Sequence, residues 1–65
     1  MRRIAMKVNV YLFDGGLLEF DIALEVIQET DEIFKFSYID RDSENARTAV
    51  FSLMNIAGYD TEYLA

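Results

Sequence analysis

The side chains of this chain that could do chemistry are carboxylates, because its 65 residues include no cysteine and no histidine. Thiolate nucleophiles, His-dependent triads and zinc sites built from Cys and His are therefore excluded. Two groups of closely spaced carboxylates are candidates for such chemistry, one at Glu19, Asp21 and Glu25 and the other at Asp40, Asp42 and Glu44.

The first group could serve general acid-base catalysis if different environments separated the pKa values of its members. We expect instead that Glu25 lies opposite Lys35, with Lys7 nearby on the other neighbouring strand, which is ordinary cross-strand charge pairing. The sequence gives no sign of a pocket around these acids. We therefore predict no catalytic residue and no cofactor, and a minimal carboxylate enzyme is the last of three functional alternatives.

The second group resembles the start of a calcium loop, in which ligands occupy positions one, three and five. The rest of that motif is missing, because Asn45 stands where the loop needs glycine and Phe51 where it needs glutamate. We interpret these acids as residues that cap a helix, and we predict no metal site.

Gly15 and Gly16 do not form a phosphate-binding loop, because no Lys-Ser or Lys-Thr follows them and the next segment is a predicted strand. They are turn residues. We predict a three-residue hairpin loop at Asp14, Gly15 and Gly16, with Gly16 in the left-handed region.

Three segments alternate apolar and polar residues with period two, which is typical of strands. They span about residues 4–13, 17–27 and 33–40, and their apolar residues occupy even positions. Residues that face each other across a sheet must share a side, so we predict an antiparallel meander with an even-numbered core face.

The remaining segment predicts a helix over about residues 43–57. Asp42 or Ser43 would cap it, and Gly58 would end it in a left-handed conformation. One side would be apolar, through Ala46, Ala49, Val50, Leu53 and Ala57. The predicted fold class is α+β, a single domain over residues 1–65 in which a three-stranded antiparallel meander packs against one C-terminal helix. Residues 59–65 would form a short acidic and aromatic tail.

Composition limits the partners that this domain can have. The chain is 52% hydrophobic, so it should be globular, and its net charge of −6 disfavours direct binding to nucleic acid or anionic lipid. Its apolar runs are far shorter than the roughly 20 residues that span a bilayer. We expect a cytoplasmic protein, in the cytoplasm of a host cell if a phage encodes it.

Several apolar residues lie on surfaces that should be exposed to solvent. In the predicted sheet Tyr11, Phe13, Leu17 and Ile39 share the outer face at the Asp14–Gly16 end, and Phe51 points away from the apolar side of the helix. Such exposed patches are common interaction surfaces. The residues that we predict to contact a partner are Tyr11, Phe13, Leu17, Glu19, Asp21, Glu25, Ile39, Phe51, Tyr59 and Tyr63. In the alternative, the tail folds back over one patch and covers it.

The first and third strands are the edges of the predicted sheet. The first is long, lacks proline and has only Lys7 as a charge in its middle, so it could pair with a strand of another chain. Simple solvation of this edge is the alternative. Small domains without disulfides are often stabilised by oligomerisation, so we also predict a homodimer.

These features favour a non-catalytic protein that interacts with another protein. The specific hypothesis is an inhibitor of a nucleic-acid-handling protein, because spaced carboxylates can imitate phosphates while aromatic residues anchor the contact. Compact acidic inhibitors encoded by phages and other mobile elements work in this general way, and the analogy rests on composition alone. The second hypothesis is an assembly subunit or antitoxin-like partner that uses the edge strand at Val8–Val10.

Overall fold

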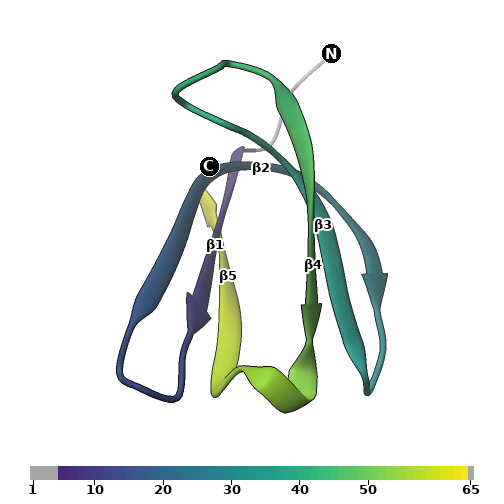
Figure 1. The fold of residues 1–65 in the computed structure, drawn as a ribbon. Coiled ribbons are helices and arrows are strands. Elements are labelled where there is room, and N and C mark those ends of the chain that lie inside the picture. Colours follow the sequence, from purple (N-terminus) through teal and green to yellow (C-terminus); the bar gives the residue numbers. More distant parts are fainter. Residues whose placement is uncertain (1–4, 65) are drawn as a thin grey trace.

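The computed structural model describes residues 5–64, which form one antiparallel sheet of five strands. In sheet order these strands are β4, β3, β2, β1 and β5 (Figure 1). The elements are β1 (Ala5–Tyr11), β2 (Leu17–Glu29), β3 (Ile33–Ile39), β4 (Ala46–Ser52), the 3₁₀ helix η1 (Leu53–Asn55) and β5 (Gly58–Leu64). The first three strands overlap the ranges predicted for them but differ at their ends.

Strand β2 is almost twice as long as its neighbours, and its two halves pair with different strands. Residues 17–23 pair with β1, and residues 23–29 pair with β3. The register shifts once between β1 and β2 and twice between β2 and β3. Such bulges bend a strand and increase its twist, and Figure 1 shows β2 crossing from one half of the sheet to the other.

The shift opposite β1 reverses which residues of β2 face the core. Before it, Phe20 packs against the core from an even position. After it, Ala23 is buried, whereas Ile22 and Leu24 are each 45% exposed. The prediction that the even residues of this strand all face one core is therefore wrong for Ile22 and Leu24, because a one-residue slip moves the side chains that follow it to the other face. The next shift, between Ala23 and Glu25, restores the even pattern, and Val26 packs against the core.

The sheet is strongly curled, and the connection between its two edge strands explains why. In a flat sheet β4 and β5 would lie four strand spacings apart, about 19 Å. Residues 53–57 join them and include the three residues of η1. With about 2.0 Å per 3₁₀ residue and 3.4 Å for the others, this connection reaches roughly 16 Å. The sheet must curl to bring its edges together.

The core lies inside the curl and combines aliphatic residues with aromatic rings. Its buried residues are Met6, Val8, Val10, Ala23, Phe34, Phe36 and Ile56. Phe20 meets Phe36 edge to face, with ring centroids 5.0 Å apart, and Tyr59 stacks on Phe34 at 3.9 Å. These pairs join β2, β3 and β5, so the aromatic packing holds the two halves of the curl against each other.

The predicted helix over residues 43–57 is absent, and the middle of this segment is strand β4, which pairs with β3 along seven residues. Thr48, Val50 and Phe51 are poor helix formers and suit a half-buried strand. Alternation also fits, because Ala49 and Phe51 pack on the core while Val50 is exposed. The helical part of residues 5–64 is η1, and no helix there is long and apolar enough to cross a membrane.

The acids predicted to cap that helix instead organise the loop between β3 and β4. The Asp40 carboxylate accepts hydrogen bonds from the Asp42 backbone N–H at 3.1 Å and from the Ser43 hydroxyl at 3.1 Å. The Glu44 N–H donates to the Asp40 carbonyl, and Glu44 itself has φ 59°. The second carboxylate group is thus part of a turn, with Asp40 at its centre.

The two glycine predictions are also wrong. In the loop between β1 and β2 the left-handed residue is Gly15, with φ 90°, rather than Gly16. Gly58 does not have positive φ, because it starts β5 instead of ending a helix. The first loop is longer than predicted, since β1 ends at Tyr11 and β2 begins at Leu17.

The tail predicted at residues 59–65 is β5 as far as Leu64, and Ala65 lies outside the described residues. Strand β5 pairs with β1 along seven residues, from Ala5 opposite Leu64 to Tyr11 opposite Gly58. Neither β1 nor β3 is therefore an edge of the sheet. The hypothesis of partner-strand addition at Val8–Val10 is contradicted, and the edges are β4 and β5.

Replacing Phe51 with alanine should lower the free energy of unfolding by about 2 kcal/mol or more, because its ring packs against Phe20 and Phe36. The adjacent change Val50→Ala should cost under about 1 kcal/mol, since that side chain is on the outer face. Urea denaturation of both variants measures the difference. Equal and small losses would contradict the strand assignment.

Candidate functional site

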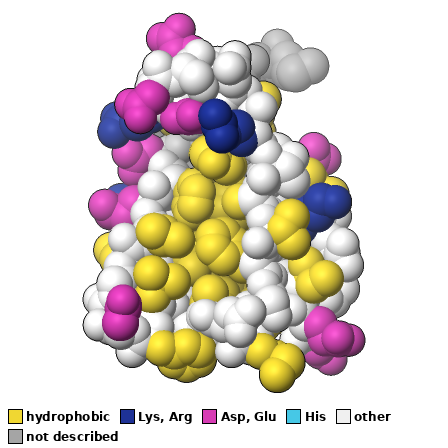
Figure 2. All heavy atoms as spheres, in the orientation of Figure 1, with side chains coloured by type: hydrophobic (Ala, Val, Ile, Leu, Met, Phe, Trp, Pro, Cys, Tyr) yellow, Lys and Arg dark blue, Asp and Glu magenta, His cyan; other side chains and the backbone are white. Residues whose placement is uncertain are grey.

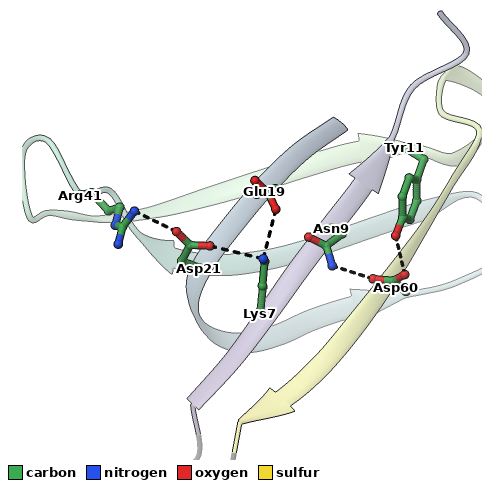
Figure 3. Close-up of polar contacts among 7 residues, drawn as sticks. All are labelled: Lys7, Asn9, Tyr11, Glu19, Asp21, Arg41 and Asp60. Carbon is green, nitrogen blue, oxygen red and sulfur yellow. Dashed lines mark hydrogen bonds and ion pairs between the residues drawn. The ribbon is translucent and has the colours of Figure 1, made fainter. Parts of the chain in front are cut away.

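The strongest pattern on the surface is a group of polar residues on the outer side of β5, β1 and β2, which we call the acidic face. On β1 its residues alternate with the buried Met6, Val8 and Val10. Its members are Lys7, Asn9, Tyr11, Glu19, Asp21, Asp60 and Glu62 (Figure 3 shows all but the last). Two carboxylates on β2 and two on β5 thus flank the central strand β1. Lys7 of β1 is paired with Glu62 of β5. Asn9 of β1 is paired with Asp60 on one side and with Glu19 on the other.

Lys7 ties the central strand to the carboxylates of β2. Its Nζ lies 3.1 Å from Glu19 Oε1 and 3.9 Å from Asp21 Oδ1. Asp21 is also held from the other side, because Arg41 Nη1 lies 2.9 Å from its Oδ2 (Figure 3). The hydrogen bond from Lys7 to Glu19, followed by their charge attraction, raises the pKa of Lys7 above its ordinary value. The ammonium therefore stays charged at neutral pH.

Asp60 is the most fully bonded carboxylate of the acidic face. Asn9 Nδ2 donates to its Oδ1 at 2.9 Å, and the Tyr11 hydroxyl donates to its Oδ2 at 2.7 Å. These two hydrogen bonds lower the pKa of Asp60, with a smaller contribution from the charge of Lys7. The bond to Asp60 also raises the pKa of Tyr11. The site is thus a fixed anion with a neutral tyrosine beside it.

This arrangement suits binding better than proton transfer. A general acid at neutral pH needs a raised pKa, and that of Asp60 is lowered. The Lys7 and Tyr11 pKa values move away from neutrality as well. What the acidic face offers is negative charge at fixed positions on three hydrogen-bonded strands.

A shallow hollow of about 270 Å³ lies beside the acidic face, where β2 meets the loop between β3 and β4. Arg41 and the carboxylate of Asp21 meet at this place. Its lining combines charge with apolar surface and consists of Glu19, Phe20, Asp21, Tyr38, Ile39, Asp40, Arg41 and Asp42. The acidic surface therefore continues from the strands onto this loop.

Three of the predicted apolar contact residues lie together at the end of the sheet next to the acidic face. Tyr11 is the strand neighbour of Leu17, and Phe13 is in the loop that joins their strands. Their exposed fractions are 40% for Tyr11, 47% for Leu17 and 72% for Phe13. We call these three residues the apolar tip. It lies at one end of the acidic face, and Tyr11 belongs to both the tip and the acidic face.

Ile39 does not join this tip as expected. Its neighbour Tyr38 pairs with Ala23, whereas Leu17 lies six residues earlier on β2, about 20 Å away along the strand. Glu25 is opposite Ser37, and Lys35 is opposite Gln28, so the predicted pair of Glu25 with Lys35 is also wrong. The predicted Glu25 pair is wrong because β2 continues to Glu29, opposite Phe34, so the turn is shorter than the gap predicted between residues 27 and 33. Whether Ile39 and Glu25 contact a partner stays a prediction.

Phe51, Tyr59 and Tyr63 have positions that differ from those predicted for them. Phe51 is half-buried on β4 and packs on the core, so it is not an exposed helical residue. Tyr59 is half-buried on β5, and its hydroxyl donates to Glu29 Oε2 at 2.7 Å, which raises the tyrosine's pKa. Tyr63 is 66% exposed on the same strand. Tyr63 alone of these three is open to contact.

Sequence reasoning missed Asn9, Asp60 and Glu62 as members of the acidic face. A signal was present, because Tyr59, Thr61 and Tyr63 alternate with Asp60 and Glu62 over the last strand. This period-two pattern is typical of a strand with one polar side. The missing information was the pairing of this strand with β1, which brings residues 51 positions apart into contact.

Changing Tyr11 to phenylalanine should raise the pKa of Asp60 toward its ordinary value of about 3.9, since one of its two stabilising hydrogen bonds is lost. Carboxyl ¹³C NMR titration measures this shift. In the wild type, Asp60 contributes stability above about pH 3.9 that disappears as pH falls through its lowered folded pKa. In the variant, Asp60 should contribute less to the free energy of unfolding over that acid range.

The matched control is Tyr59→Phe, which removes a similar hydroxyl from the same sheet. Its partner is Glu29, so the pKa of Asp60 should not change. An unchanged Asp60 pKa in Tyr11→Phe would show that the tyrosine does not stabilise the carboxylate.

No protein-family model, no curated protein and no solved structure matches this chain. Its function therefore has to be inferred from its own residues, among which the acidic face is the most regular polar group.

Proposed function

We propose that this protein is a non-catalytic interaction module whose acidic face binds a basic surface of another protein. The observation that carries the proposal is the placement of Glu19 and Asp21 on β2 and of Asp60 and Glu62 on β5, on either side of β1. Four carboxylates thus project from one side of three paired strands.

The sheet fixes the spacing of these charges. Alternate residues of a strand lie about 6.7 Å apart, and strands separated by one neighbour lie about 9.5 Å apart. Hydrogen bonds to Asn9 and Tyr11 hold Asp60, and ion pairs hold Glu19 and Asp21. Side chains that are already ordered lose less entropy on binding, so a basic partner would meet a prepared array of anions.

The partner class that fits this array is a protein that normally handles nucleic acid. Such a protein has a basic surface that accepts regularly spaced negative charge, and carboxylates on a rigid sheet can occupy it. Binding would then inhibit or modulate its activity. Lys7 and Arg41 reduce the charge on the β2 side, so the β5 carboxylates contribute much of the net field.

The apolar tip supplies the second component of an interface. Tyr11, Phe13 and Leu17 are exposed next to the carboxylates. Aromatic residues provide much of the binding energy of protein interfaces, whereas complementary charges mainly set specificity and the rate of association. The partner would therefore have an apolar depression beside its basic surface. Under this proposal the protein acts in the cytoplasm, where nucleic-acid-handling proteins work.

Affinity capture from a lysate of the native cells, followed by mass spectrometry, should yield a nucleic-acid-handling protein that duplex DNA or RNA displaces. Its binding should weaken steeply as the salt concentration rises from about 50 to about 300 mM, because salt screens the attraction between opposite charges. The variant Glu19→Gln with Asp21→Asn should reduce its affinity roughly tenfold, equivalent to about 1.4 kcal/mol.

The control variant is Asp31→Asn with Glu32→Gln, which removes the same two charges from the exposed loop between β2 and β3. It should bind as the wild type does. A captured metabolic enzyme, or binding that salt does not affect, would rule out mimicry of nucleic acid.

A further inference from the structure

The two edge strands of the sheet differ in charge. Strands β3 and β4 contain Lys35 and Arg47 and no acidic residue, although the whole chain carries twelve acids. At the opposite edge, β5 contains Asp60 and Glu62 and no basic residue. The sheet thus has one weakly cationic edge and one anionic edge.

The cationic edge has few features that prevent strand addition. Proteins protect an exposed edge with proline, inward charges or bulges. Strand β4 has seven residues, pairs with β3 in an unbroken register and has no proline. Arg47 is already paired, with Nε 3.0 Å from Asp40. Nearby, Val50 is 59% exposed and Met54 is 86% exposed.

The cation available to a partner at this edge is Lys35. Among residues 5–64 the ion pairs involve Lys7, Arg41 and Arg47, and Lys35 forms none. It lies on β3 directly beside Val50 of β4. A strand added to β4 would therefore lie two strand spacings from Lys35, about 9.5 Å, within reach of a lysine and a glutamate side chain together.

We infer that the β4 edge of one copy of this chain pairs with the β5 edge of a second copy. Glu62 on the outer side of β5 would then approach Lys35, and on the inner side the exposed Tyr63 would approach Ala49 and Phe51. The added strand also supplies backbone N–H and C=O groups to the free side of β4. The pairing thus brings together backbone hydrogen-bonding groups, side chains of opposite charge and apolar side chains.

The other two pairings between copies are electrostatically worse. Joining two β4 edges brings no carboxylate of β3 or β4 to the Lys35 of either copy, because these strands contain none, and joining two β5 edges brings four carboxylates together. Like charges at adjacent strands are destabilising. Figure 2 shows hydrophobic side chains gathered on the side of the molecule where β4 and β5 lie, and the added strand would cover part of this surface.

Pairing of two different edges is a heterologous contact, and it generates a closed ring or a filament rather than a two-fold dimer. This inference does not depend on the proposed function. The carboxylates that the capture experiment alters are Glu19 and Asp21 on β2, whereas the present contact uses Glu62 on β5. Glu62 also belongs to the acidic face, whereas Lys35 lies outside it, so Lys35→Glu tests the contact between copies without changing the proposed partner surface.

Light scattering during size-exclusion chromatography should show assemblies larger than a dimer for the wild type. Each single charge reversal, Lys35→Glu or Glu62→Lys, should reduce the assembly to monomer, with at least a tenfold rise in the apparent dissociation constant. The double variant should assemble again, and so should an equimolar mixture of the two single variants, because opposite charges then face each other. Far-UV circular dichroism checks that each variant is folded.

The matched control is Asp31→Lys, which changes the net charge as Glu62→Lys does but lies in the loop between β2 and β3. Its assembly should equal that of the wild type. A monomeric wild type would overturn the inference, as would a dimer insensitive to Glu62→Lys. Failure of the double variant to reassemble would refute the contact between Lys35 and Glu62.

Discussion

The structure depends on the sharing of one strand, β2, by both halves of the sheet. A core of this size cannot form on a flat sheet of five strands, because no second layer is present among residues 5–64 to cover it. The bend of β2 allows the sheet to fold over itself, so that Phe34 and Phe36 from one half meet Val8, Val10 and Tyr59 from the other. One curved layer thereby replaces the usual two. The same bend turns Ile22 and Leu24 outward, which accounts for part of the exposed apolar surface.

The first three strands could be predicted from the sequence because each alternates clearly, with Val8 and Val10 or Phe34 and Phe36 on one side. Strand β4 could not, because Ala46, Ala49, Val50 and Leu53 match a helical period as well as a strand, and short apolar segments are ambiguous in this way. This segment forms a strand because it pairs with β3 along seven residues. Tertiary contacts commonly override such weak local preferences.

The acidic face was predictable only in part, for a related reason. Glu19 and Asp21 were identified because they alternate within one strand whose outer side was clear. The bonds of Asp60 to Asn9 and Tyr11 depend on contacts between distant segments, which no local pattern contains. Bulges are equally invisible, since they are defined by two residues facing one across a partner strand. The pairing predicted for Glu25 was wrong because β2 continues to Glu29 before the turn, and the alternation of β2 does not show where that turn begins.

The pairing of β1 with β5 has a consequence for the order in which the chain folds. Ala5 and Leu64 are partners, so this contact closes a loop that contains nearly all of the described residues. Domains with many such distant contacts fold slowly, because the entropy of loop closure is lost before the contacts form. During synthesis β1 emerges from the ribosome first and β5 last. Until then the free side of β1 is open to other nascent chains, so a chaperone that shields this strand would raise the yield of folded protein.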